Sequence, residues 1–272
     1  MYKLKIFVLI AITFGLIGCA NGPLEPFGYH PHYESQSFNL EGKKALIITT
    51  SHDQLGEDGD PTGVFGSEMT APYYEFLKQG MEVDLASIKG GEIPIDPISF
   101  KWGVKSSYDS RYQEDSVFQN KAKHSIKIDN IDFTQYDTIF LAGGWGAAYD
   151  LGYSEVLGQK ISEAYAAGIP VGGVCHGPLG LLKAKNEKGE SLIKGRRLTA
   201  VTDKQIHELS VDVTPLHPET ELRKAGVIYE SESAFFDIFA NHVVVDGIIV
   251  TGQNQNAGAE VASKMMAIIA EQ

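Results

Sequence analysis

The sequence predicts an α/β fold in which a mostly parallel β-sheet carries helices on both faces. Short apolar runs of strand length alternate with segments of helical periodicity along most of the chain. The strand-like runs are apolar throughout, as in parallel sheets that are buried on both faces. Such alternation is typical of right-handed β-α-β units. The 272 residues, 43% of them hydrophobic and 21% charged, suffice for one folded domain with a substantial core.

The first β-α unit begins at Lys44. Residues 44–50 form an apolar run and predict a buried strand. A helix is predicted next, because apolar residues recur at helical spacing until Gly80, a plausible helix end. The residues of this apolar face are Met69, Tyr73, Phe76 and Leu77.

The alternation continues toward the C-terminus. Further strands are predicted over 83–86, 138–142 and 169–174, with a helix over 157–165 that ends at Gly168. The polar, weakly periodic stretch 100–130 predicts a small insertion with short helices, either a surface excursion or a lid over a site.

The C-terminal part closes the predicted sheet. Asp246 and Gly247 lie between two β-branched runs, which predicts a hairpin. Residues 257–270 predict a final amphipathic helix.

The N-terminus predicts a signal peptide. Two lysines within the first five residues precede an apolar run over 6–17, which is too short to span a bilayer. Leu16 to Cys19 resembles a bacterial lipobox, which implies that Cys19 is lipidated and anchors the protein to a membrane. An ordinary secretory peptide with an incidental cysteine is the alternative. Ala20 follows rather than Asp, and by resemblance to bacterial sorting rules this favours the outer membrane, facing the periplasm.

These features predict three regions: a lipoprotein signal peptide over 1–18, a lipid-anchored tether over 19–42 and one α/β domain over 43–272. The tether is rich in Pro, Gly, His and aromatic residues and has no period. The formal net charge of −12 argues against nucleic acid as a partner, because a phosphate backbone is bound through Lys and Arg.

The second cysteine, Cys175, is the candidate nucleophile. It stands between the apolar strand ending at Val174 and an apolar helix predicted over 178–182. A nucleophile on such a strand-to-helix turn is exposed at the sheet edge, and a helix N-terminus lowers the pKa of a thiol. His176 follows directly, so that its backbone N–H points to a developing oxyanion and its side chain is a candidate acid or base. A buried structural cysteine beside a surface histidine is the alternative.

Val174 to Pro178 reads Val-Cys-His-Gly-Pro and resembles the elbow of the ThiJ/PfpI family, relatives of class I glutamine amidotransferases. The resemblance extends from about Lys43 to the C-terminus and implies a flavodoxin-like, doubly wound fold. Its other blocks follow in the family's order, at 62–68, 71–73, 84–91, 96–97, 136–144, 192–202 and 243–254.

The branch that the chain resembles most is the glyoxalase III type, which also resembles stress chaperones. The resemblance implies that Cys175 is the nucleophile, Glu68 its partner carboxyl and His176 the neighbouring acid or base. It also implies that the N–H groups of Gly144 and His176 form the oxyanion hole. No cofactor is implied.

Three positions depart from the family's pattern. Trp145 stands where a histidine usually follows the second Gly-Gly pair, and Ile206 stands where an acid should orient the catalytic histidine. Asp203 and Glu208 are nearby substitutes for that acid, although surface charges are the simpler interpretation. Leu77 replaces a metal-binding histidine of one branch, so we expect no metal.

The predicted activity is that of a glyoxalase III-type lyase, which would convert methylglyoxal or a related 2-oxoaldehyde to a 2-hydroxy acid through the Cys175 thiol. A stress chaperone for unfolded or glycated proteins, or a redox sensor that uses Cys175, is the alternative, and a cysteine amidase or peptidase ranks lower. The resemblance also implies a homodimer.

Overall fold

A computed structural model describes residues 24–57 and 59–272. The signal peptide and the lipidation site at Cys19 lie outside the described residues. No helix among the described residues is long and apolar enough to cross a membrane.

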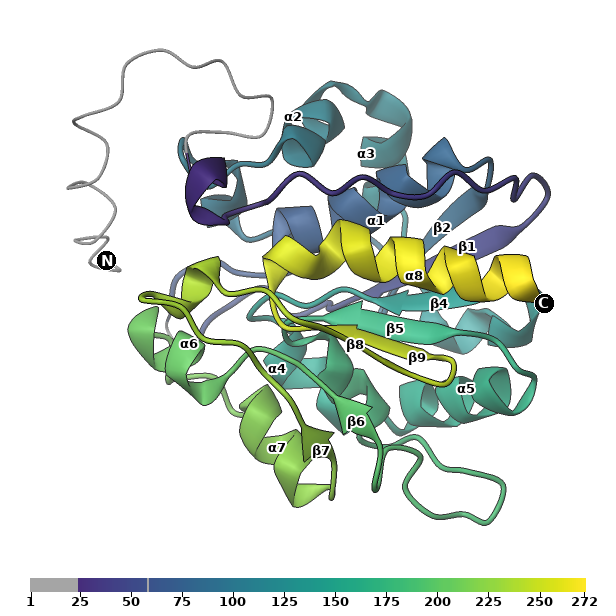
Figure 1. Cartoon of the computed structure of the whole chain (residues 1–272). Helices are drawn as coiled ribbons and strands as arrows, with labels where there is room; N and C mark the ends of the chain where they lie inside the picture. Colours follow the sequence, from purple (N-terminus) through teal and green to yellow (C-terminus); the bar gives the residue numbers. More distant parts are fainter. Residues whose placement is uncertain (1–23, 58) are drawn as a thin grey trace.

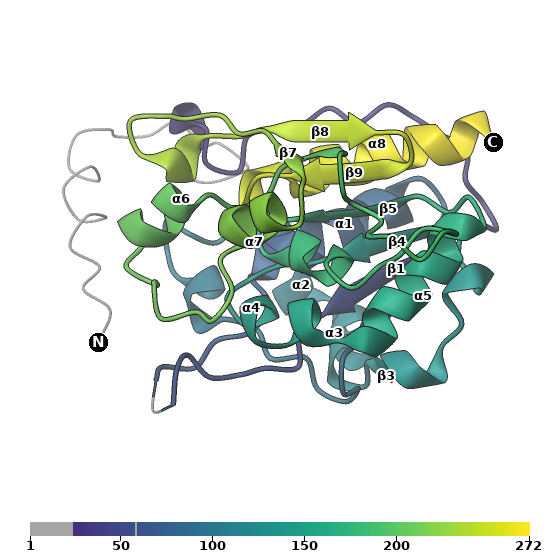
Figure 2. The same cartoon turned by 90° about the horizontal axis from the view of Figure 1, so that it is seen from below.

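The centre of the domain is a seven-stranded sheet of order β3-β2-β1-β4-β5-β9-β8 (Figure 1). Every neighbouring pair is parallel except β8 and β9, which form the predicted hairpin. Figure 2 shows β8 and β3 at the two edges of the sheet. The strands are β1 (Lys44–Thr49), β2 (Glu82–Ser87), β3 (Ile126–Lys127), β4 (Thr138–Leu141), β5 (Val171–Val174), β8 (Val243–Asp246) and β9 (Ile249–Gly252).

Helices cover both faces of this sheet, which confirms the predicted α/β class (Figure 1). Helices α1 (Gly66–Lys78) and α8 (Gly258–Glu271) lie on one face, and α4 (Ala147–Asp150) and α5 (Glu155–Ala166) lie on the other. Because successive side chains of a strand point to opposite faces, β1 contributes to both cores. Ile47 packs with α1 and α8, whereas Leu46 and Ile48 pack with α4 and α5.

The predicted insertion is present and folds as two short helices, α2 (Ser107–Glu114) and α3 (Ser116–Lys123). They pack beside α1 and at the β2 edge of the sheet. A second excursion, between β5 and β8, was not predicted. It carries β6 (Arg197–Leu198), α6 (Asp203–Glu208), α7 (Pro218–Lys224) and β7 (Ile228–Tyr229), and β6 and β7 pair in a small separate sheet.

The residues before β1 lie on the domain surface. They begin with a 3-10 turn at Glu25–Phe27 and then run beside α8 toward the start of β1 (Figure 1). Tyr29, His30 and Leu40 of this segment are buried. The stretch 24–42 is therefore packed against the domain along much of its length.

The prediction of an apolar α-helix directly after Cys175 is wrong. Residues Gly177–Leu181 form a five-residue 3-10 helix instead of an α-helix. Gly177 and Gly180 are poor helix formers, and the segment is fixed by close packing on β4.

Candidate active site

Cys175 lies at the carboxyl end of β5, at the elbow that its sequence context predicts. Its backbone has a φ of 58°, a left-handed conformation that is strained for a residue with a side chain. Two backbone hydrogen bonds hold it there, one from its N–H to the oxygen of Gly252 and one from the N–H of Val201 to its own oxygen, both 3.1 Å. The turn requires Gly177, where a Cβ would lie 2.1 Å from the Leu141 oxygen.

Glu68 reaches the thiol from the first turn of α1. Its side chain is 1% exposed, and its carboxyl interacts with the Cys175 thiol and with the N–H groups of Gly143 and Gly144. One oxygen, Oε2, is buried without a hydrogen-bonding partner among the described residues. A Cβ at Gly143 would lie 2.5 Å from this oxygen, so only glycine leaves room for the carboxyl.

Burial determines the protonation of this pair. It raises the pKa of Glu68 from an ordinary 4.5 to about 8, although the thiol and the N–H groups oppose the shift. Burial, followed by the charge of Glu68, also raises the pKa of the Cys175 thiol. The lowered thiol pKa expected from a following helix is therefore wrong, because the 3-10 turn is short and desolvation dominates. Near neutral pH, Glu68 carries a proton beside Sγ.

His176 also contacts the sulfur. Its Nδ1 is 3.4 Å from Sγ of Cys175, and its ring meets the Trp145 ring edge to face at 5.1 Å. The ring is completely buried, and burial, with a smaller contribution from His217, lowers the pKa of His176 to about 3. The imidazole is thus neutral at physiological pH, and no cationic histidine stabilises a thiolate here.

No carboxylate among the described residues bonds to the His176 ring. Its Nε2 is buried and has no hydrogen-bonding partner among the described residues. Ile206, at the expected position of the acid, is fully buried in the same hydrophobic core as Cys175. The two substitutes are engaged elsewhere: Asp203 accepts a hydrogen bond from Thr220, and Glu208 accepts one from the N–H of Asp237.

Two backbone N–H groups lie within reach of the Cys175 sulfur, as an oxyanion hole would require. Those of Gly144 and His176 interact with the Cys175 thiol and oppose the rise in its pKa. Gly144 has a φ of 91°, and a Cβ there would lie 2.3 Å from the nitrogen of Phe65, so the loop can take this shape only with glycine.

The structure thus brings together the sequence-predicted residues Cys175, Glu68, His176 and Gly144, on three separate segments. Leu77 lies far along α1 from Glu68 and is 37% exposed. Among residues 24–57 and 59–272, no three His, Cys, Asp or Glu side chains are grouped to hold a metal ion.

Tyr29 is a buried residue of the segment before β1 that sequence reasoning missed. It is 3% exposed, and burial, followed by the charges of Asp109 and Glu68, raises its pKa. No signal in the aperiodic stretch 24–42 marks it, because its position depends on how that stretch folds back over the domain.

Residues 62–268 match the model of the DJ-1/PfpI family. The chain is 30% identical to "Glyoxalase 3" of Candida albicans over 234 residues, which covers 83% of this chain and 97% of the relative. It is 33% identical to "Glutathione-independent glyoxalase HSP31" of Saccharomyces cerevisiae, with 78% of this chain and 92% of the relative covered.

Solved structures give the same result. The crystal structure of glyoxalase III from Candida albicans matches with a TM-score of 0.74 and 30% identity over 83% of this chain and 97% of the other. Rapid Encystment Protein 24 KDa of Francisella tularensis matches with a TM-score of 0.77 and 31% identity, over 84% of this chain and 99% of the other.

Proposed function

The chain belongs to the DJ-1/PfpI family, and on this premise we propose that it is a glutathione-independent glyoxalase. Its substrate is methylglyoxal or a related 2-oxoaldehyde, and its product is the corresponding 2-hydroxy acid. The observation that carries the proposal is the contact of a buried, protonated Glu68 carboxyl with the Cys175 thiol. This pair supplies a nucleophile and a proton carrier at one point, as an internal redox isomerisation requires.

The first step forms a hemithioacetal. The sulfur of Cys175 adds to the aldehyde carbon, and the thiol proton passes to the former carbonyl oxygen. The N–H groups of Gly144 and His176 stabilise the negative charge that develops on this oxygen. Glutathione, the external thiol of other glyoxalases, is unnecessary because the protein supplies the thiol.

The second step moves hydrogen between the two substrate carbons. A base removes the proton from the hemithioacetal carbon, and the neighbouring ketone carbon receives a proton, so that one carbon is oxidised to a thioester as the other is reduced to an alcohol. We assign this exchange to Glu68, since its pKa of about 8 allows both protonation states near neutral pH. His176, neutral and without an orienting acid, is the weaker candidate. Water then hydrolyses the thioester and restores the thiol.

The test is lactate formation from methylglyoxal by the purified chain in buffer that contains no glutathione. We expect one lactate for each methylglyoxal consumed, because the isomerisation and hydrolysis add only water. Consumption of the aldehyde without lactate would indicate covalent trapping on side chains and would contradict the proposal.

A redox sensor or chaperone is the second candidate. It draws support from the unpaired Nε2 of His176 and from Ile206 in place of the acid, because both weaken a catalytic triad. However, oxidation follows thiolate character, and burial raises the pKa of the Cys175 thiol. Peroxide should therefore convert Cys175 to sulfinic acid slowly. The amidase alternative is weaker still, since it needs the oriented histidine.

We also propose that the protein is a lipoprotein of the cell envelope, anchored through Cys19 and facing the periplasm. The support is the sequence Leu16 to Cys19 after an apolar run. Cells fed labelled palmitate should incorporate the label into the wild-type chain and not into Cys19→Ser. Equal labelling of both chains would contradict the anchor. The homodimer stays a prediction from the resemblance.

A further inference from the structure

Large aromatic side chains are exposed at one end of the domain. Phe235 and Trp102, 90% and 78% exposed, are the two most exposed large hydrophobic side chains among residues 24–57 and 59–272, and Phe27 is 51% exposed. Side chains of this size gain free energy when they leave water, so a group of exposed ones indicates a binding surface. These three residues are here called the aromatic surface.

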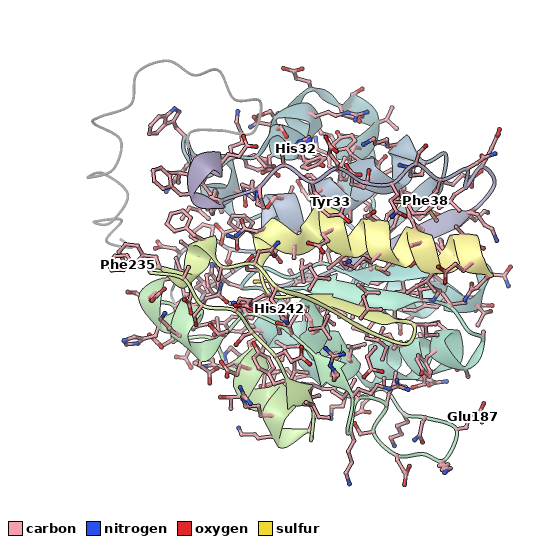
Figure 3. All side chains as sticks on the ribbon, viewed as in Figure 1. His32, Tyr33, Phe38, Glu187, Phe235 and His242 are labelled. Atoms are coloured by element: carbon pink, nitrogen blue, oxygen red, sulfur yellow. The ribbon has the colours of Figure 1, made fainter. Side chains whose placement is uncertain are left out.

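The start of the segment 24–42, here called the N-terminal strap, packs on the loop that carries Phe235. The rings of Phe27 and Phe239 are 6.3 Å apart, and a Cβ at Gly28 would lie 3.0 Å from the oxygen of Phe239. Figure 3 shows Phe235 at the outer edge of the domain, at the end where the described chain begins. Phe27 and Phe235 therefore belong to the same end of the molecule.

The loop that carries Trp102 meets the strap a few residues further on. Nε2 of His30 lies 3.2 Å from the oxygen of Val104, two residues after Trp102. The N–H of His30 donates to Oδ1 of Asn256 over 2.8 Å, in the loop that follows β9. Because β9 is parallel to β5, this is the edge of the sheet at which Cys175 lies. The aromatic surface thus borders the carboxyl edge of the sheet.

Hydrogen bonds hold the strap at its other end as well. The side chain of Gln79 accepts a bond of 2.7 Å from the N–H of Phe38 and donates one of 3.2 Å to the oxygen of Gln36. At the start of the strap, the oxygen of Leu24 accepts a bond of 3.0 Å from the N–H of Phe27. The strap is therefore bound along the domain beside α8, and Leu24 lies next to the aromatic surface (Figure 1).

This arrangement shortens the predicted tether. Leu24 is the fifth residue after Cys19, the proposed lipidation site. Five residues span at most about 18 Å when fully extended. A lipid on Cys19 would hold the aromatic surface close to the bilayer, whereas a free tether over all of 19–42 would leave the orientation of the domain open.

We propose that the aromatic surface docks on the lipid bilayer, so that the carboxyl edge of the sheet faces the membrane. The inference rests on the proposed anchor at Cys19. Tryptophan and phenylalanine suit this contact, because their rings partition into the boundary between headgroups and acyl chains. The contact is apolar: a chain with a formal net charge of −12 is not attracted by anionic lipid, so a zwitterionic phosphatidylcholine surface is sufficient.

The test follows the fluorescence of Trp102 in phosphatidylcholine vesicles whose acyl chains carry bromine, which quenches tryptophan on contact. The chain has two tryptophans, so Trp145→Phe leaves Trp102 as the single reporter. The full chain is purified from cells and combined with the vesicles. We expect its fluorescence to be roughly halved relative to unbrominated vesicles, since an interfacial ring lies at the level of the headgroups, beside the acyl chains.

The matched control places the reporter at the opposite end of the sheet. Val245 is 41% exposed in β8, close to the hairpin turn, which lies far from the start of the strap (Figure 1). A chain with Val245→Trp, Trp102→Phe and Trp145→Phe should show no quenching. Equal quenching of the two reporters would indicate adsorption without a defined face and would overturn the proposal.

Loss of the neighbouring rings should weaken the docking. Phe27→Ser and Phe235→Ser should each lower the ratio of docked to undocked chain, read from the quenching of Trp102, by about tenfold. Ile228→Ser is the control, because Ile228 is 55% exposed but lies in β7, away from the aromatic surface (Figure 1). All three positions are at the surface, and circular dichroism confirms that the variants fold.

The outcomes separate docking from anchoring. If labelled palmitate is not incorporated but Trp102 is quenched selectively, the anchor fails and the docking surface stands. If palmitate is incorporated but Trp102 is quenched no more than the Val245→Trp control, the anchor stands and the docking surface is overturned. Unquenched Trp102 together with a dimer that Phe235→Ser converts to a monomer would assign the surface to a second copy of the chain and would also overturn the proposal.

Discussion

Cys175→Ser should lower lactate formation from methylglyoxal by about 10³-fold or more. A serine hydroxyl is a poor nucleophile unless a base activates it. Neither neighbour is a strong base near neutral pH, because Glu68 is mostly protonated and a pKa of about 3 makes the neutral His176 ring a weak base. The replacement is nearly isosteric at a position that is 7% exposed, so we expect the thermal unfolding midpoint to change little. The measurement is lactate by enzymatic assay, with circular dichroism to confirm the fold.

Cys19→Ser is the matched control for this variant, since it makes the same chemical replacement outside the α/β domain. It should retain the wild-type rate in solution. A Cys175→Ser chain that keeps even a tenth of the wild-type rate would show that the thiol is not the nucleophile and would remove the basis of the proposed mechanism.

Glu68→Gln should lower kcat by about 10²- to 10⁴-fold, the usual contribution of a positioned acid or base. Glutamine fills the same buried space beside Sγ but cannot exchange a proton. The control is Glu75→Gln, two turns further along α1, where the carboxyl is also buried and accepts a hydrogen bond from Tyr108 over 2.7 Å. Turnover that survives in Glu68→Gln but not in Glu75→Gln would contradict the assignment of proton transfer to Glu68.

The same variant should change how stability depends on pH. The pKa of Glu68 rises from 4.5 to about 8 on folding, so its contribution to stability is complete below pH 4.5 and is lost as the pH rises toward 8. Each pKa unit corresponds to about 1.4 kcal/mol. The free energy of unfolding of the wild type, relative to Glu68→Gln, should therefore fall by a few kcal/mol between pH 5 and pH 8. Urea unfolding at both pH values measures this difference, and a constant difference would contradict the raised pKa.

Local patterns were enough to predict most of the sheet. The apolar runs at 44–50, 83–86, 138–142 and 169–174 lie within one or two residues of the observed strands. The Asp246-Gly247 pair predicted the hairpin correctly, and Gly80 and Gly168 follow α1 and α5 with positive φ values. These elements can be predicted from the sequence because hydrophobic periodicity and turn residues depend on only a few neighbouring positions.

The excursion between β5 and β8 was missed for the opposite reason. Its strands β6 and β7 have two residues each and form by pairing with one another. The two strands are far apart in the sequence, so no local pattern predicts this pairing. The 3-10 turn after Cys175 also depends on contact, since Gly177 and Gly180 pack against Leu141 of β4.

The sequence by itself predicted Cys175 as the candidate nucleophile on a strand-to-turn elbow with His176 beside it, and the family resemblance added Glu68 and Gly144 as candidate partners, because each stands in a recognisable local motif. Only the tertiary structure decided their protonation and their surroundings. Burial protonates Glu68, raises the pKa of the Cys175 thiol and keeps His176 neutral. Desolvation depends on every segment that covers a group, and those segments come from distant parts of the chain.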